Sequence, residues 1–488
     1  MNRMSSTKFE TAKKITAGLV LAAALFGAGN HAHAQAGIDP QTRDMLISKL
    51  TQVYLNLAPG DSSKVAITLR LADLHAERAR MDAMTELQWV CTQCAAGNSD
   101  RKKALLYYQE VLPKTPETSI GKVLAQVGHL YELTGDQKAA VATYSRILAE
   151  QKAPEARAEA NLSLAELYFK RRDYALARKH YGEVLASPTA ASRGLAAYRT
   201  AWCEFNDERL SQAIDGLVAV LKSPELLSRS AAAGVIQVDK QFQEEVSRDL
   251  ATFMARRAVS VKDASLLYDL SPENAKIANI TYLATELERL GQVAPAIAVW
   301  RFTQEKQSKP QARLKGHVRL AQLEMEQKLT VEAAKDFAQA LSIWTTMGTC
   351  NETDCPELKA RMRKFVVDWN RMEKKAPSDG LLEAYKGYLK TFPKEGDMSL
   401  WAAIVASDLK QFALAYELHQ KTAALATETL ASPTSDTTQK KEAGERLETS
   451  LLAAIEAAEE AKDQKMLDQA YDSYLASSRE KKKALEVR

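Results

Sequence analysis

The sequence predicts an all-α protein, a solenoid in which antiparallel helix pairs stack into a superhelix. Ala, Leu, Glu, Lys and Gln dominate the 488 residues, whereas there are only 20 Gly and 14 Pro, a composition that favours helices. Small and large side chains recur at a fixed offset in two parts of the chain. The chain is too long for one compact core, which leaves several domains or one elongated stack.

The N-terminus has the features of a cleaved secretory signal peptide at residues 1–34. A basic stretch over 3–14 precedes an apolar run over 15–28, and an A-x-A motif occupies 32–34. The apolar run is too short for a membrane span, and an uncleaved anchor is the alternative interpretation. We therefore expect a periplasmic protein that is not inserted in the membrane after signal cleavage.

The charge of the chain gives no reason to expect a nucleic-acid partner. The formal net charge is +4, and removal of residues 1–34 takes away four basic residues and one acidic residue, which leaves +1. A nucleic-acid-binding surface needs a basic cluster, and no long run of one charge sign occurs.

A repeated segment sets the register of the helix pairs. After a shift of 37 residues, Gly128, Tyr131, Ala140 and Tyr144 fall on Ala165, Tyr168, Ala177 and Tyr181. The same shift takes Ala284, Ala296 and Trp300 to Ala321, Ala333 and Phe337. A small residue in the first helix lets the second helix approach closely, and the large residue fills the space towards the next repeat.

The residues between the helices fit this register. Gly135 is suited to end a helix, and Asp136 and Asp173 are suited to cap the next one. Asp39 and Pro40 form a plausible N-cap and first helical residue at the start of the mature fold.

These positions resemble the consensus of the tetratricopeptide repeat (TPR) family, in which a small residue, an aromatic residue, an Ala and a second aromatic residue follow one another at set spacings. The resemblance implies a TPR-type α-solenoid. A generic helical bundle with Ala-rich faces is the alternative. The clearest repeats are expected at 119–150, 156–187, 193–224, 276–307 and 313–344, and weaker ones at 37–110, 226–270, 380–424 and 441–478.

The expected organisation has four parts after the signal peptide. An N-terminal TPR array covers 35–225 with a Cys-bearing insertion at 82–100, a middle array covers 226–344, a Cys-bearing interruption covers 345–378, and C-terminal TPR-like helices cover 379–488. Solenoids need terminal caps, and no clear capping helix ends the sequence. We therefore expect that the chain is the N-terminal part of a longer protein.

A second resemblance concerns the stretches 70–74, 100–104, 198–206 and 247–250. They are similar to the large periplasmic TPR proteins of gliding and predatory bacteria. This resemblance implies partners in the cell envelope and its motility machinery. The stretches are packing motifs, so they bear on architecture and compartment more directly than on task.

We find no motif that predicts catalysis. The sequence contains no H-E-x-x-H, G-x-S-x-G, P-loop or G-x-G-x-x-G motif, whereas an active site needs convergent polar groups. The expectation is a protein that is not an enzyme and has neither a cofactor nor a small-molecule substrate. The histidines of the mature chain lack metal-ligand spacing and are expected to be structural or surface residues: His75, His129, His180, His317 and His419.

Four of the five cysteines form two local pairs, Cys91 with Cys94 and Cys350 with Cys355. In an oxidising compartment such pairs predict short-loop disulfides. A redox C-x-x-C site is an alternative for the first pair, and a four-cysteine zinc site is an alternative for both. The zinc site is disfavoured because repeats of a solenoid contact only their neighbours. Cys203 is expected to be a buried thiol.

The first helix of each pair should line the concave face of the superhelix. Its outward positions carry charges of both signs, which favours a polar peptide or protein partner. The candidate groove residues are Lys122, His129, Glu132, Glu159, Glu166, Lys170, Arg199, Asn206, Thr285, Glu288, Arg289, Lys315 and Gln322.

The leading hypothesis is a periplasmic scaffold that binds envelope or motility proteins through this groove. The alternative is the accessory or N-terminal solenoid part of a cell-wall-acting enzyme whose catalytic domain is absent from this chain. The Glu-Ser motif of the lytic transglycosylases does not occur here. A β-barrel assembly lipoprotein is disfavoured because no Cys follows the predicted cleavage site.

The cysteine assignment predicts a labelling pattern. Protein purified without reductant should react with a thiol reagent at Cys203 alone, because the other four cysteines are expected to be disulfide-bonded. Mass spectrometry of the labelled peptides measures this. Labelling at all five cysteines would overturn both disulfides and count against export.

Overall fold

A computed structural model of the chain describes residues 39–88, 96–228, 237–347 and 354–477. The expected signal peptide and Cys91, Cys94 and Cys350 lie outside these residues, so those expectations remain predictions. Within the described ranges the chain is almost entirely helical and forms no strand, and one isolated antiparallel bridge joins Ser228 to Val238.

The described residues divide into two compact units, one up to Ala196 and one from Ala197. The first unit contains α2 (Pro40–Asn56), α3 (Ser62–Gln88), α4 (Asn98–Val111), the 3₁₀ turn η1 (Leu112–Lys114), α5 (Glu117–Thr134), α6 (Gln137–Glu150), α7 (Pro154–Lys170) and α8 (Tyr174–Leu185). Here α3 packs against α4, α5 against α6 and α7 against α8, and α2 packs on α3.

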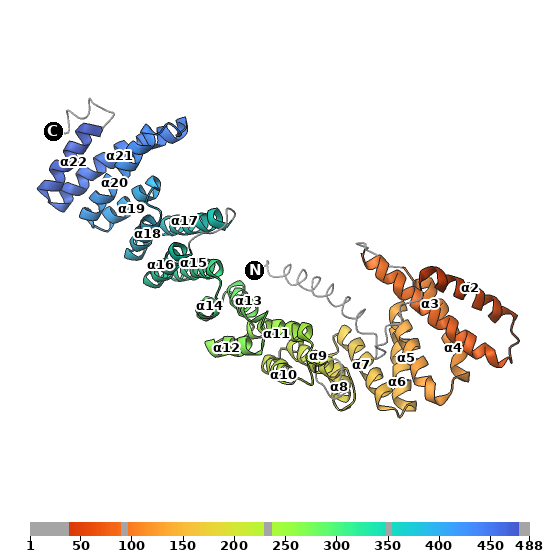
Figure 1. Cartoon of the computed structure of the whole chain (residues 1–488). Helices are drawn as coiled ribbons and strands as arrows, with labels where there is room; N and C mark the ends of the chain where they lie inside the picture. Colours follow the sequence, from red (N-terminus) through yellow and green to blue (C-terminus); the bar gives the residue numbers. More distant parts are fainter. Residues whose placement is uncertain (1–38, 89–95, 229–236, 348–353, 478–488) are drawn as a thin grey trace, which may run out of the picture. The chain divides into compact units, whose positions relative to one another are not determined.

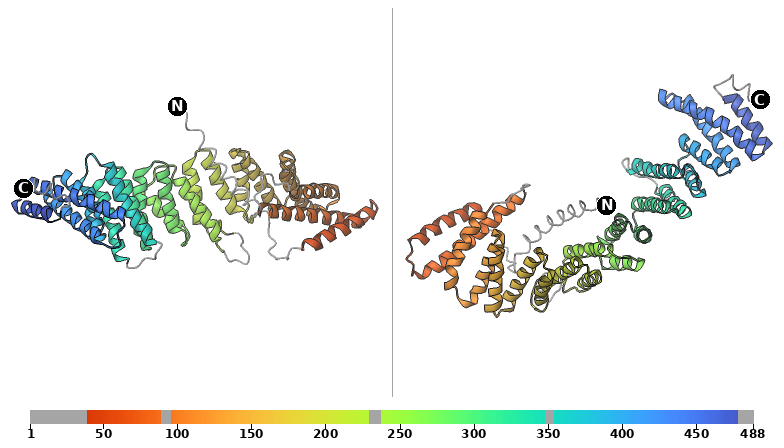
Figure 2. Two further views of the ribbon diagram at one scale, coloured as in Figure 1. Left: turned by 90° about the horizontal axis from the view of Figure 1, so that it is seen from above. Right: turned by 180° about the vertical axis from the view of Figure 1, so that it is seen from behind.

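The second unit contains most of α9 (Arg193–Asn206) and all the helices that follow. These are α10 (Leu210–Lys222), α11 (Lys240–Met254), α12 (Val261–Leu270), α13 (Lys276–Arg289), α14 (Val293–Lys306), α15 (Pro310–Glu326), α16 (Thr330–Thr346), α17 (Asp354–Met372), α18 (Asp379–Thr391), α19 (Gly396–Asp408), α20 (Phe412–Ala431), α21 (Thr437–Ala461) and α22 (Gln464–Ser477). From α11 onwards consecutive helices pack as pairs, and the views of Figure 2 show α19, α20 and α21 side by side. The all-α, TPR-like helix-pair fold that the sequence predicts is confirmed.

The packing positions of the repeat have the burial that the register requires. Ala140, Tyr144, Ala177 and Tyr181 are at most 2% exposed. A Cβ atom on Gly128 would lie 2.6 Å from Cε1 of Tyr144, a distance far below van der Waals contact. The small residue of the first helix is therefore required by the ring of the second helix.

The turn inside each pair repeats as well. Gly135 ends α5 in the left-handed conformation with φ of 85°, and Gly291 has φ of 75° at the corresponding turn after α13. At other such turns a residue with a side chain adopts φ between 55° and 63°: Arg172, Glu208, Lys328, Lys410 and Lys462. The left-handed backbone geometry of this turn is thus the same at positions where the sequence has no glycine.

The predicted N-caps are present. The Asp39 side chain accepts a hydrogen bond from the backbone N of Thr42 at 3.0 Å, with Pro40 as the first residue of α2. Asp136 caps α6 through the N of Ala139 at 3.0 Å, and Asp173 caps α8 in the same way. These bonds satisfy helix N–H groups that have no partner within the helix.

The expected interruption at 345–378 contains a helix that continues the pairing. Helix α17 packs against α15 and α18. Its apolar residues fall at helical spacing, and Phe365, Val366 and Trp369 are fully buried. The segment lacks the Ala and aromatic positions of the repeat consensus, so its sequence does not stand out as a first helix even though it packs as one.

The contact between paired helices can be tested at α8 with one substitution at two positions. Ala177→Trp should lower the free energy of unfolding by about 1–3 kcal/mol, because Ala177 is fully buried and the indole has no space. Ala175→Trp, on the exposed side of the same helix, is the matched control and should have little effect. Chemical denaturation followed by circular dichroism measures both. Equal stability of the two variants would contradict the register.

Candidate functional site

Each unit has a face formed by the first helices of its repeats. In the first unit, the term first-helix face denotes the side of α5 and α7 that carries Lys122, His129, Glu159 and Lys170. In the second unit it is the side of α9, α11, α13, α15 and α17 that carries Asn206, Arg248, Thr285, Gln322 and Arg371. Successive first helices contact each other at α5/α7, α11/α13 and α15/α17.

The predicted groove residues differ in exposure. Seven of them are exposed: Lys122, His129, Glu159, Lys170, Asn206, Thr285 and Arg289. Half-buried are Glu132, Glu166, Arg199, Glu288, Lys315 and Gln322. The candidates up to Lys170 belong to the first unit and those from Arg199 onwards to the second, so each set is described with its own unit.

The half-buried carboxylates are held by the packing residues of the second helix. The Tyr144 hydroxyl donates to Glu132 at 2.7 Å and the Tyr181 hydroxyl donates to Glu166 at 2.6 Å. The Trp300 indole N–H donates to Glu288 in the same manner. These acids, which the sequence suggested as partner contacts, therefore also position the repeat itself.

The next first helix supplies a cation to two of these acids. Lys170 of α7 lies 3.7 Å from Glu132 of α5. Nε of Arg319 in α15 donates to Glu288 of α13 at 3.0 Å. The aromatic donor, the acid and the cation thus link three helices of two successive repeats.

Two groups on the face of the first unit have shifted pKa values. His129 and Glu159 are both exposed. Desolvation nevertheless lowers the pKa of the His129 imidazole and raises the pKa of the Glu159 carboxyl. Both shifts favour the neutral form of the group.

Aromatic residues and an acid meet on the face of the second unit. The Tyr198 hydroxyl and the Trp202 indole N–H donate to Asp249 of α11 at 2.5 and 2.9 Å. Desolvation raises the pKa of Asp249 to about 6 in spite of these two bonds. Beside it, the exposed Arg248 guanidinium stacks 3.7 Å from the centre of the Tyr282 ring, a cation–π contact that holds the arginine in place.

Two cavities open between successive first helices of the second unit. The first, of about 420 Å³, lies between α11 and α13, and most of the residues that line it are of polar type, among them Arg248, Glu245 and Asn279. The amide N of buried Asn279 donates to the hydroxyls of Ser247 and Ser271 at 2.9 and 3.0 Å. Hydrogen bonds within the protein therefore hold the Asn279 side chain in the wall of this cavity.

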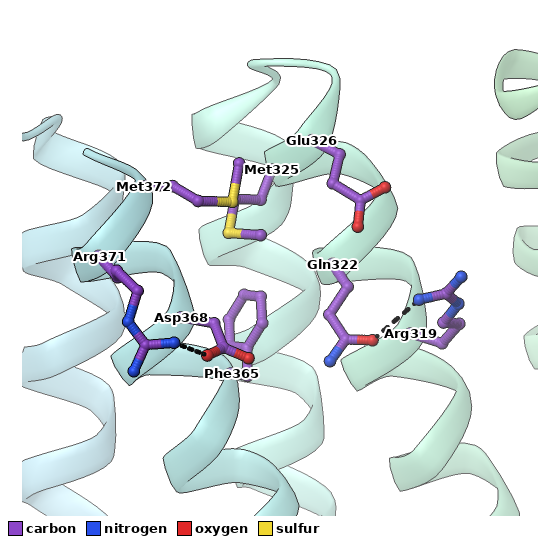
Figure 3. A pocket seen from close by; sticks show the side chains of 8 residues that line it. All are labelled: Arg319, Gln322, Met325, Glu326, Phe365, Asp368, Arg371 and Met372. Carbon is purple, nitrogen blue, oxygen red and sulfur yellow. Dashed lines mark hydrogen bonds and ion pairs between the residues drawn. The ribbon is translucent and has the colours of Figure 1, made fainter.

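The second cavity, which we call the α15/α17 notch, has about 340 Å³ and an apolar floor. Figure 3 shows Met325 of α15 with Phe365 and Met372 of α17 projecting into it. Met325 is 7% exposed, Phe365 is fully buried and Met372 is 59% exposed. The rim is charged and consists of Arg319, Gln322, Glu326, Asp368 and Arg371.

The histidines of the described residues lie apart in separate repeats. His75 contacts Asp100 at 2.5 Å, His180 contacts Asn161 at 2.9 Å, and His317 contacts Asp336 at 2.8 Å. His419 is buried in α20, where desolvation lowers its pKa to about 4. Within the described ranges no three His, Cys, Asp or Glu side chains are grouped as a metal site would require.

The cysteines that are described support part of the expectation. Cys203 is fully buried in α9, as predicted, so its labelling requires prior unfolding. Cys355, near the start of α17, is disulfide-bonded. Its pairing with Cys350 stays a prediction because Cys350 lies outside the described residues. No helix in the described part of the chain combines the length and the apolar character of a membrane span.

Several residues of the candidate surface were not predicted from the sequence. Of the residues lining the notch, only Gln322 was among the candidates; Met325, Phe365 and Met372 were not. Their signal in the sequence is weak because α17 departs from the consensus. Arg248 and Asp249 fall in the stretch 247–250, which the sequence marked only as a packing motif, because α11 lies in one of the weaker repeats.

Comparison with known proteins relates the chain to others by fold alone. No protein-family model and no curated protein matches it. Among solved structures, the C-terminal part of a TPR repeat-containing protein from Cytophaga hutchinsonii is 15% identical, over 66% of this chain and 97% of that chain, with a TM-score of 0.23. Naa15/Naa10 bound to HypK-THB is 13% identical, over 89% of this chain and 75% of that chain, with a TM-score of 0.29. Scores this low support no conclusion about function.

The tethering of carboxylates by packing residues can be tested at α6. Tyr144→Phe removes the donor to Glu132 and should lower the free energy of unfolding by about 1 kcal/mol, because a largely buried hydrogen bond is lost while the ring remains. Tyr131→Phe is the control, since its hydroxyl accepts only an exposed bond from Gln109. Denaturant unfolding compares the two, and a Tyr131→Phe variant that loses as much stability would contradict the assignment.

Proposed function

We propose that this protein is a non-catalytic scaffold that holds extended segments of other proteins along its first-helix faces. The observation that carries the proposal is the α15/α17 notch, an apolar floor with a charged rim between two successive first helices. A binding site for a peptide side chain has this composition, because the apolar part is desolvated and the rim contacts the polar backbone.

The prearranged polar side chains support the same conclusion. Arg319 is held by Glu288 and Gln322, at 3.0 and 3.2 Å, on one side of the notch. Arg371 is held by Asp368 at 3.2 Å on the other side. Side chains that are already fixed lose little conformational entropy on binding. A surface of this kind is suited to bind a segment that is disordered when free and becomes ordered on binding.

The rim favours a partner segment of mixed polarity. It carries two arginines and two acids, and both arginines are already paired. The apolar floor therefore offers the main gain on binding, which is the burial of one large apolar side chain such as Leu, Met or Phe. The polar cavity between α11 and α13 would take a hydrogen-bonding side chain of the same segment.

The compartment and the partner class are further parts of the proposal. The sequence at 1–34 has the features of a signal peptide, and Cys355 is disulfide-bonded, a state found mainly in oxidising compartments. We place the protein in the periplasm, with proteins of the cell envelope or its motility machinery as partners.

Site-specific photo-cross-linking in the native cell tests the scaffold role. A photoreactive amino acid at Gln322, on the rim of the notch, should capture a discrete partner protein that mass spectrometry identifies. The matched control is Gln339, an exposed glutamine on the second helix α16 of the same repeat, which should capture no such partner. Met372→Ser should reduce capture at Gln322 at least severalfold because the notch loses apolar surface.

Two results would contradict the proposal. Equal capture at Gln322 and Gln339 would show that the first-helix face is not the binding face. Cross-links at Gln322 that are insensitive to Met372→Ser would show that the notch is not used. A captured cytoplasmic protein would overturn the compartment but leave the scaffold role intact.

A further inference from the structure

Glu324 occupies a position that is aromatic in two other repeats. Three residues after the small residue of the first helix stand Tyr131 in α5 and Tyr168 in α7, whereas Glu324 stands there in α15. Its side chain is 0% exposed. A carboxyl group in the core of a helix repeat is costly unless it is neutral or fully paired.

The surroundings of Glu324 provide one cation and one further acid. Arg301 of α14 donates to Oε1 of Glu324 at 2.5 Å. The carboxyl groups of Glu324 and Asp336 of α16 are within hydrogen-bonding reach of each other. Oε2 of Glu324 is buried and has no donor among the described residues. Two ionised carboxylates would repel each other there, whereas a proton on one of them would join them.

Other charged groups around α15 are already paired. Nδ1 of His317 lies 2.8 Å from Asp336. On the α13 side Glu288 is bound by Arg319, and on the α17 side Glu357 is 3.3 Å from Lys315. The groups that act directly on Glu324 are therefore Arg301 and Asp336, and His317 acts through Asp336.

We propose that Glu324 and Asp336 share one proton, and that its loss at higher pH loosens α15 from α14 and α16. The shared proton satisfies the buried Oε2 and cancels the repulsion between the two acids. Without it, a second negative charge remains in the core with only Arg301, whose side chain is half exposed, as its partner. The joint between these helices is thus a pH-sensitive element of the fold.

The direction and range of the effect follow from the Glu324 carboxyl. Desolvation, followed by the charge of Asp336, raises its pKa from 4.5 to about 7. A carboxyl whose pKa is higher in the folded state than in the unfolded state contributes stability below its unfolded pKa, and that contribution is lost as the pH rises through the folded pKa. The loss therefore occurs between about pH 4.5 and pH 7.

Helix α15 would also connect the pH effect to partner binding. The same helix carries Arg319, Gln322 and Met325, which line the notch. Loosening of α15 would move one wall of that cavity. This consequence rests on the proposed function, whereas the proton sharing does not and can be tested on the protein alone.

Hydrogen–deuterium exchange of the full chain between pH 5 and pH 8.5 tests the shared proton. Each variant is compared with the wild type at the same pH, so the intrinsic dependence of exchange on pH cancels. Glu324→Gln keeps the shape of the side chain but does not ionise. The exchange rate of the backbone amides in α15 and α16 is measured for both proteins. The ratio of the wild-type rate to the variant rate should rise with pH, by up to about a hundredfold, because the pKa of Glu324 differs between the folded and unfolded states. Glu326→Gln, an exposed carboxylate on the same helix, is the control and should match the wild type.

A second variant keeps the test decisive if Glu324→Gln does not fold. Asp336→Asn removes the neighbouring charge and offers an N–H donor to Glu324, so the pKa of the Glu324 carboxyl should fall and α15 should loosen less with rising pH than in the wild type. A wild-type to Glu324→Gln ratio that does not change with pH would overturn the proposal. So would an Asp336→Asn protein whose α15 exchange follows the wild-type pH dependence.

If exchange shows the pH effect but cross-linking at Gln322 does not change over the same pH range, the joint is pH-sensitive without controlling the partner. If Gln322 captures no partner at any pH, the proposed function fails while the exchange result still decides the proton sharing.

Discussion

The close approach of two helices within each repeat is the constraint on which the rest of the structure depends. A Cβ atom on Gly128 would lie 2.6 Å from the Tyr144 ring, so the first helix has to be small where the second is large. Burial of Tyr144 and Tyr181 removes large apolar surface from water and so stabilises each pair. Stacking the pairs extends this core from one repeat to the next.

The same large residues determine the character of the first-helix face. Tyr144, Tyr181 and Trp300 are apolar along their rings and polar at their tips, and each tip donates a hydrogen bond to an acid on the first helix. Core packing and surface arrangement are therefore coupled, because the ring that fills the interior also orients a carboxylate on the outside. Cations from the next first helix complete the link, and the face is ordered before it meets a partner.

Departures from the repeat consensus mark the places with additional chemistry. Helix α17 lacks the consensus residues, yet it supplies Phe365 and Met372 to the notch. Glu324 replaces an aromatic residue and introduces a buried carboxyl beside Asp336. Where a repeat keeps its backbone geometry and changes a core residue, the cost in stability has to be offset elsewhere, and both proposals made above concern such positions.

The sequence by itself determined the helix pairs, their 37-residue register, the caps at Asp39, Asp136 and Asp173, and the burial of Cys203, because these depend on local spacing and on residue size. Only the tertiary structure decided which side chains are available to a partner. Glu132 and Glu288 had the pattern of exposed acids, but residues from another helix of the same repeat and from the next repeat hold them. The notch and the Glu324–Asp336 pair likewise join residues of different helices. The spacing of residues along a single helix does not predict such contacts.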